Sequence, residues 1–416
     1  MIRADDLQEN RKIHSKGRKI ASFLGLQRSI VGMLVMVVLV GMGEQLAERF
    51  LPIYLIALGA GVWVVAFVNA MDNFLSAIYA FYGGYISDRI GTKRSLLFFN
   101  LLAMLGFAIV AIVPYWQAAL VGTFFFISWS AISLPATMSL VHHALPSHKR
   151  TMGVTMNSLV RRIPKALGPI IGGGLIGLFG VTAGIRVAFC VALLMSIIAA
   201  VFQQRMIEDA KSQTEHSGNP EKNPFRMFKK MDCGLRNLLI SDILIRFCEQ
   251  IPYPFVVIWC MKTIAKPVSG FQFGLLTAIE MAVAMLVYIP VAYLVGRSSK
   301  KPYILITYVF FTAFPLTLMF CNSFWPLVGA FIVRGLKEFG EPTRKSLILE
   351  LAPAHSKAGM FGLYYLIRDV VVSIAAMSAG FLWLISPQVN FLTATAFGVI
   401  GTLWFAVKVK YVPAEN

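Results

Sequence analysis

Charged side chains interrupt two apolar stretches of this sequence. Arg368 and Asp369 lie within YLIRDVVVS, and Arg161 and Arg162 lie within SLVRRIPKA, 207 residues earlier. A charge in a bilayer is costly, so such a side chain normally faces a water-filled cavity or an ionic partner. The chemistry open to these residues is the binding of a charged solute, the loading and release of a proton, or mutual neutralisation.

Helical spacing gathers further charges into stripes. Glu44 and Glu48 are four residues apart and share a helix face, and Arg49 lies beside them. The apolar spans hold nine acids and eight bases: Glu44, Glu48, Asp72, Asp242, Glu249, Glu280, Glu338, Glu341 and Asp369 against Arg49, Arg161, Arg162, Lys165, Arg246, Arg334, Lys337 and Arg368. This near balance favours mutual neutralisation and a polar cavity of mixed charge over a purely anion-binding site.

The elements that position these charges are predicted to be membrane helices. Of 416 residues, 57% are hydrophobic and 14% are charged, whereas a soluble chain carries roughly 25% charged residues. The composition predicts an all-α membrane protein, because so much apolar surface requires lipid as a solvent. Apolar runs predict twelve transmembrane helices, near 28–56, 61–86, 95–114, 116–143, 151–179, 182–204, 237–262, 270–296, 302–321, 325–351, 358–384 and 388–408.

The net charge of +18 is distributed as in a membrane protein and not as in a nucleic-acid-binding one. Basic residues precede the first span and follow the even-numbered spans, while the loops after the first, third, ninth and eleventh spans are almost free of charge. This positive-inside pattern places both termini in the cytoplasm. We therefore expect the lipid bilayer as a partner and no nucleic acid.

The two halves of the sequence resemble each other. A shift of 207 or 208 residues aligns Arg161 with Arg368, Asp72 with Glu280, and Arg89 with Arg297. A polar interval divides the spans into six and six, and parallel repeats of this kind build transporters. The predicted organisation is a basic N-terminus at 1–27, a six-helix bundle at 28–204, a cytoplasmic linker at 205–236, a second six-helix bundle at 237–410 and a tail at 411–416.

The stretch GGYISDRIGTKRS resembles the loop between the second and third helices of the major facilitator superfamily. The matching positions are Gly84, Asp88, Arg89, Gly91, Lys93 and Arg94. The resemblance extends over essentially the whole chain, and it implies two pseudo-symmetric six-helix bundles that work as an alternating-access carrier. This sequence departs from the family at two places: Gly296 stands where the repeat would place a second acid, and the fourth span lacks the arginine of many proton antiporters.

A second motif, LGPIIGG, resembles the G-P-x-x-G-G element of antiporter branches of this family. Its residues are Gly168, Pro169, Gly172 and Gly173. Small residues let helices approach closely, and proline removes a backbone donor. Ordinary small-residue packing would produce the same pattern; read as the antiporter element, it favours export.

Three functional hypotheses follow. The first is a secondary transporter that exports a small organic molecule in exchange for protons, with Asp72, Glu280 and Glu44 as the main coupling carboxylates. The second is an importer or exchanger of an anionic metabolite, and the third is a non-transporting receptor or scaffold. The residues predicted to bind substrate or gate the path are Glu44, Glu48, Arg49, Arg161, Arg162, Lys165, Arg246, Glu249, Arg334, Glu338, Glu341, Arg368 and Asp369.

Asp72 and Glu280 are preferred as proton carriers because neither has a cation within one turn of its own helix. No spacing typical of an enzyme, a metal site or a nucleotide-binding loop is present in the sequence, so we expect no enzymatic activity, no cofactor and no metal. We expect a monomeric, multi-pass protein of a bacterial inner membrane.

Overall fold

The structure, a computed structural model, describes residues 28–126, 160–207, 228–229, 231–295, 300–352 and 357–409, with single positions 129, 133, 137 and 140. At 28, 80–85, 87–89, 288–295, 349 and 357–359 it describes the backbone alone. The predicted terminal segments 1–27 and 411–416, and most of the predicted linker 205–236, lie outside the described residues.

The described part of the chain is helical and contains no strand. Its helices are α2 (Arg28–Glu48), α3 (Leu51–Ala57), α4 (Val62–Ile90), α5 (Thr92–Ile112), α6 (Trp116–Phe126), α9 (Arg162–Phe179), α10 (Val181–Met206), α12 (Cys233–Gln250), α13 (Val256–Ile258), α14 (Gly270–Val295), α15 (Lys300–Met319), α16 (Phe324–Leu336), α17 (Glu341–Leu351), α18 (Lys357–Ile385) and α19 (Pro387–Lys408). Two short helical turns, η1 (Tyr253–Phe255) and η2 (Trp259–Thr263), flank α13.

Nine helical segments within the described residues are long and apolar enough to cross a bilayer. The predicted count of twelve stays a prediction, because the fourth predicted span continues from α6 into residues outside the description. In addition, α9 begins only at Arg162 and α16 ends at Leu336.

Three predicted spans are interrupted. Turns separate α2 from α3 at 49–50, α12 from η1 at 251–252, and α16 from α17 at 337–340. A proline lies within or just beyond each interruption, where its missing N–H removes a helical hydrogen bond. Irregular backbone at membrane depth is tolerated only where it is buried in protein or lines a cavity. We therefore expect these three turns to lie in the interior of the molecule and not against lipid.

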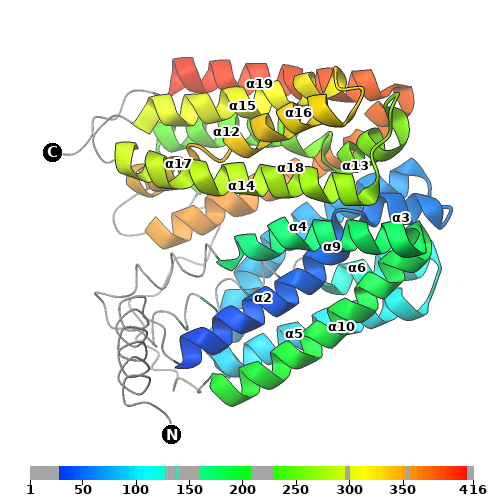
Figure 1. Cartoon of the computed structure of the whole chain (residues 1–416). Coiled ribbons are helices and arrows are strands. Elements are labelled where there is room, and N and C mark those ends of the chain that lie inside the picture. The colour runs from blue at the N-terminus through cyan, green and yellow to red at the C-terminus, as the bar shows by residue number, and fades with distance from the viewer. Residues whose placement is uncertain are drawn as a thin grey trace, which may run out of the picture.

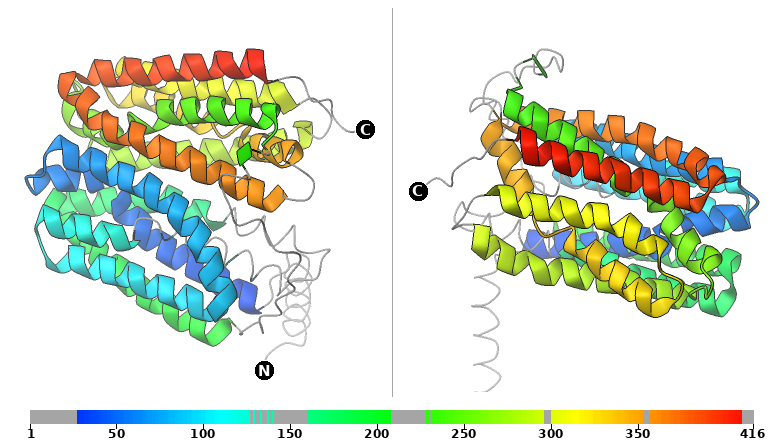
Figure 2. Two further views of the ribbon diagram at one scale, coloured as in Figure 1. Left: turned by 180° about the vertical axis from the view of Figure 1, so that it is seen from behind. Right: turned by 90° about the horizontal axis from the view of Figure 1, so that it is seen from above.

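The helices form two layers that pack along their length (Figure 1). Helices α2 to α10 lie together in one layer and α12 to α19 in the other, and Figure 2 shows the same division from two further directions. The layers meet where α9 packs on α14 and where α4 packs on α18.

The outer helices carry large exposed apolar side chains, as expected of surfaces that face lipid. Examples are Leu101 and Leu105 on α5, Ile197 on α10, Val309 on α15 and Leu403 on α19.

One of the outer helices carries a charge. Arg186 lies near the start of α10, within the sixth predicted span. Its guanidinium donates hydrogen bonds to the backbone carbonyls of Ala111 and Ile112, at 2.9 and 3.2 Å. The last carbonyls of α5 have no hydrogen-bond donor within their own helix, and Arg186 supplies one. Arg186 therefore caps α5 and does not line the cavity described below.

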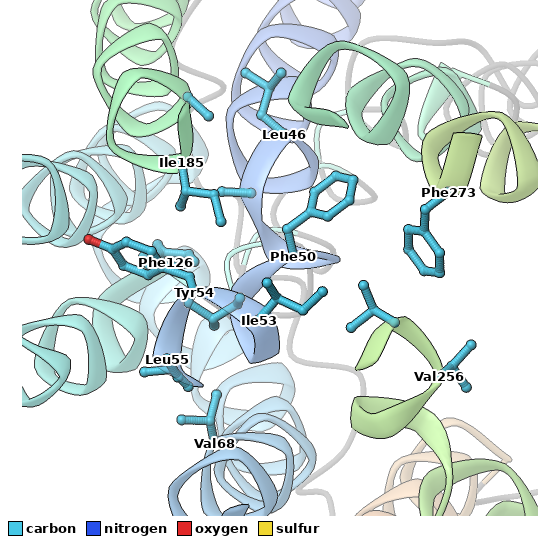
Figure 3. Close-up of a cluster of buried hydrophobic side chains, with 14 of the residues drawn as sticks. Leu46, Phe50, Ile53, Tyr54, Leu55, Val68, Phe126, Ile185, Val256 and Phe273 are labelled. Atoms are coloured by element: carbon cyan, nitrogen blue, oxygen red, sulfur yellow. The ribbon is translucent and has the colours of Figure 1, made fainter. Parts of the chain in front are cut away.

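An apolar cluster fills the space around the interruption between α2 and α3 (Figure 3). Phe50 lies beside Phe273 of α14, with ring centroids 5.7 Å apart, so the cluster joins the two layers. Tyr54, Leu55 and Val68 extend it toward α4. This packing fixes the position of Arg49, which immediately precedes Phe50.

Candidate functional site

A continuous chain of ion pairs runs through the second half of the protein. It links α12, α14, the α16–α17 segment and α18. Apart from the exposed Lys345, which also lies 3.5 Å from Glu341, it contains five acids and five bases. In order of contact these are Asp369, Arg368, Asp242, Arg344, Glu341, Arg246, Glu249, Lys337, Glu280 and Arg334. Because the formal charges cancel, the chain lowers the cost of burying each member.

The middle of this chain is its most buried part. Asp242 of α12 and Arg344 of α17 form an ion pair, and each side chain is 1% exposed. Arg344 also binds both carboxylate oxygens of Glu341, at 3.1 and 2.7 Å. Asp242 further accepts from the hydroxyl of Tyr364 at 3.1 Å and lies 3.4 Å from Arg368. These contacts tie α12, α17 and α18 together.

Arg344 and Tyr364 were not predicted as site residues. Arg344 belongs to the end of the tenth predicted span, yet it is one of the largest fully buried side chains. The available signal was spacing: Arg344 lies three residues after Glu341 and seven after Lys337, on the face that Arg334 begins.

At its other end the chain of ion pairs reaches the centre of the molecule. Lys337 lies 2.6 Å from Glu249 and 3.8 Å from Glu280, and Arg334 lies 3.3 Å from Glu280. Glu280 has no cation within one turn of its own helix, but the structure brings Arg334 and Lys337 to it from the neighbouring α16 segment. Arg246 lies 2.5 Å from Glu249, so both members of that pair are also engaged.

A small cavity lies between the two layers beside this end of the chain. Its volume is about 50 Å³, room for a few water molecules or one end of an organic molecule. Polar lining comes from both layers, with Glu48, Arg49, Asn69 and Asp72 on one side and Tyr253 and Arg334 on the other; the remaining lining is apolar, from Leu51 to Phe273.

Hydrogen bonds join the layers next to the cavity. Asn69 of α4 donates to the carbonyl of Gln250 at 3.2 Å, and Asn73 donates to the Gln250 side chain, also at 3.2 Å. Gln250 is the last residue of α12, just before the interruption in that span. Asp72 accepts from Ser76 at 3.3 Å on the same helix.

The charges predicted in the fifth span are placed differently from one another. Arg161 immediately precedes α9 and donates to Thr137 at 3.1 Å and Ser133 at 3.5 Å. Arg162 forms an ion pair across the layers with Glu338, at 3.2 Å. The side chain of Lys165 is exposed, so the structure does not bring it to the cavity. Glu44 is buried on α2, 3% exposed, and interacts electrostatically with Arg161.

The loop motif is described only in part. The backbone of α4 runs through Gly84, Asp88 and Arg89, whose side chains lie outside the description. Gly91 separates α4 from α5 with a φ of +88°, a conformation that favours glycine. Lys93 contributes its carbonyl to a hydrogen bond from Gln203 at 2.9 Å, and Arg94 is exposed.

The glycines of LGPIIGG bring α9 close to two helices. A Cβ on Gly168 would lie 2.7 Å from Cβ of Gln45, and one on Gly172 would overlap the carbonyl oxygen of Leu46, both on α2. A Cβ on Gly173 would overlap the carbonyl of Gly270 on α14, and Pro169 is buried in the same contact. The motif therefore forms part of the interface of α9 with α2 and of the interface of α9 with α14.

Helical bundles with a charged cavity between two layers are typical of membrane carriers. A comparison of the sequence with protein families identifies which family of carriers this is. The model of the Major Facilitator Superfamily matches residues 33–263 and 238–416. The chain belongs to this superfamily and is a multi-pass membrane transporter. The predicted fold class is thereby confirmed.

Individual relatives are distant. An uncharacterised MFS-type transporter of Methanocaldococcus jannaschii, MJ1317, is 20% identical over 87% of this chain and 90% of its own length. The solved structure of a POT peptide transporter in complex with sulfate has a TM-score of 0.75 at 13% identity, covering 92% of this chain and 94% of that one. A solved structure of a mutant of the nucleoside transporter NupG gives a TM-score of 0.74 at 13% identity, covering 93% and 100%.

Proposed function

We propose that this transporter is a secondary carrier that exports a small organic molecule in exchange for protons. The observation that carries the proposal is the cavity between the layers. There, two acids of the first layer meet one arginine from each layer, beside interrupted spans. Rocking of the two halves about this cavity would open it to each side of the membrane in turn.

Asp72 is the best candidate for the coupling carboxylate. It lines the cavity, so water and substrate reach it when either side opens. Glu249 and Glu280 are each shared between two cations of the ion chain and do not line the cavity. A carboxylate whose partners change with the opening of the cavity can take up a proton on one side and release it on the other.

Export is favoured by the glycine motif of α9, which resembles that of antiporters and packs against α14 at the boundary between the layers. The alternative of an anion importer built on Arg161, Arg162, Lys165, Arg246 and Arg368 has less support. Arg246 and Arg368 belong to the neutral ion chain, Arg162 is paired with Glu338, and Lys165 is exposed.

The role of Asp72 is tested in liposomes. Comparing metabolites of cells with and without the gene identifies a substrate, which is then supplied to reconstituted protein under an imposed pH gradient. We expect Asp72→Asn to abolish uphill accumulation and to leave one-for-one substrate exchange intact, because exchange needs the site but not the proton. Asp232→Asn, an exposed acid at the start of α12, should retain both activities. Uphill accumulation by Asp72→Asn at the wild-type level would contradict the assignment.

We further propose that the carrier acts as a monomer in a bacterial inner membrane with both termini in the cytoplasm. The distribution of basic residues supports this orientation.

A further inference from the structure

Arg49 stands apart from the other central cations. It lies in the turn between α2 and α3 and lines the cavity. Its Nε is buried and has no hydrogen-bond acceptor among the described residues, and no carboxylate of those residues lies within ion-pair distance of its guanidinium. Arg49 therefore shares the cavity lining with the acids Glu48 and Asp72 without forming an ion pair with a described carboxylate, whereas Arg334 is paired with Glu280.

Glu48, Glu280 and Glu249 lie near enough to Arg49 to interact electrostatically with it, but none of them is within ion-pair distance. Glu48 accepts a hydrogen bond from the side-chain amide of Gln45, on its own helix. Glu280, an acid of the ion chain at this end, is held by Arg334 and Lys337. A partly buried guanidinium without a bound anion is costly in a membrane protein, and its unpaired Nε retains hydrogen-bonding capacity for a ligand.

The ring of Tyr253 is a contact that Arg49 shares with Arg334. The guanidinium carbon of Arg49 lies 5.2 Å from the ring centroid of Tyr253, and that of Arg334 lies 5.6 Å from the same centroid. Both arginines line the cavity, and the ion pair of Arg334 with Glu280 is made through its Nε. A guanidinium group matches the planar, bidentate geometry of a carboxylate, and the cavity lining contains two of them.

The remaining lining of the cavity is apolar. Leu51, Pro52 and Leu55 come from the α3 side, while Val256, Val257 and Phe273 come from the other layer. A ligand whose charged end lies at Arg49 would therefore place an apolar body against these side chains, where burial of hydrocarbon is favourable.

We infer that the transported molecule is an organic carboxylate with an apolar body, whose carboxylate is bound by Arg49 with help from Arg334. The inference rests on the proposed function in that it assigns the substrate class of the same cavity. It does not depend on proton coupling or on the direction of transport.

The experiment measures equilibrium binding, without any gradient, as the shift in thermal unfolding temperature of the detergent-purified full chain. The probes are butanoate, hexanoate and benzoate, each compared at equal ionic strength with its amide and with the amine of matching size. A ligand that binds only the folded protein raises the unfolding temperature. We expect at least one carboxylate to raise it by several degrees, and the matched amide and amine to have less than a third of that effect.

Arg49→Gln should lose the carboxylate-induced shift. Arg186→Gln should keep it, because Arg186 binds backbone carbonyls at the far end of α5. Equal shifts for carboxylate and amide, or no shift with any carboxylate, would overturn the inference, and so would a full shift in Arg49→Gln. If Arg49→Gln does not fold, the comparison of carboxylates with amides and amines on the wild-type protein still shows whether binding requires a negative charge.

Failure here and failure of the proposed function are distinguishable. Loss of carboxylate binding with retained pH-driven transport would reject only the substrate class. Carboxylate binding together with uphill transport by Asp72→Asn would reject only the coupling scheme.

Discussion

At the scale of single residues, the protein solves the problem of charge in a membrane by pairing almost every buried ion with another. Asp242 receives three donors from three different side chains, and Arg344 binds two acids. Such an arrangement is strongly interdependent, because removing one member leaves a partner buried and unpaired.

Asp242→Asn is therefore expected to destabilise the protein by about 3–5 kcal/mol, since Arg344 and Arg368 both lose a counter-charge. Arg344→Gln should be similarly costly, and the double variant should cost less than the sum of the two. Unfolding midpoints in detergent measure these effects. Lys345→Gln is the control: Lys345 is 47% exposed and lies 3.5 Å from Glu341, so its loss should cost less than about 1 kcal/mol. Strictly additive effects of the two core substitutions would show that the pair is not coupled.

The sequence predicted much of this site at the level of residue type and helix face. It identified the charged spans, the stripes on α12 and α16, and the near balance of acids and bases. It could not pair them, because the partners of Glu280 and Asp242 come from helices far away in the chain. Arg344 was not among the predicted residues, and its burial depends on its contact with Asp242 of α12, which the sequence alone does not show.

At the scale of helices, close approach of backbones decides where the layers meet. Gly173 of α9 touches α14, whereas its neighbour Gly174 faces open space, with no atom within 4 Å of the position that a Cβ would take. Interrupted helices were the element-level feature that apolar periodicity failed to reveal. Runs such as 325–351 read as one span, although a turn at 337–340 divides α16 from α17.

Gly173→Ala should push α9 away from Gly270 and lower both the unfolding temperature and the transport rate. Gly174→Ala is a matched control on the same helix, and it should be neutral or slightly stabilising because alanine favours the helical conformation. The comparison uses thermal unfolding in detergent and initial transport rates in liposomes. If both substitutions behave alike, the contact between α9 and α14 is not as tight as the geometry implies.

At the scale of the whole molecule, the positive-inside pattern predicts an orientation that labelling can test. Cys233, at the start of α12, should face the cytoplasm, and Asn322 and Gln388, both exposed just beyond the far ends of α15 and α18, should face outward. In a background without the other cysteines, Asn322→Cys and Gln388→Cys should react with a membrane-impermeant thiol reagent in intact cells. Cys233 should react only after permeabilisation, and its labelling in intact cells would reverse the assigned orientation.

The unbroken ionic chain of the second half also limits how this sequence can change over generations. Replacing any one of its ten members by a neutral residue leaves an odd charge in a space that has little water to screen it. We therefore expect substitutions in this chain to occur in compensating pairs. Positions 242 and 344, and positions 280 and 334, should vary together among related sequences.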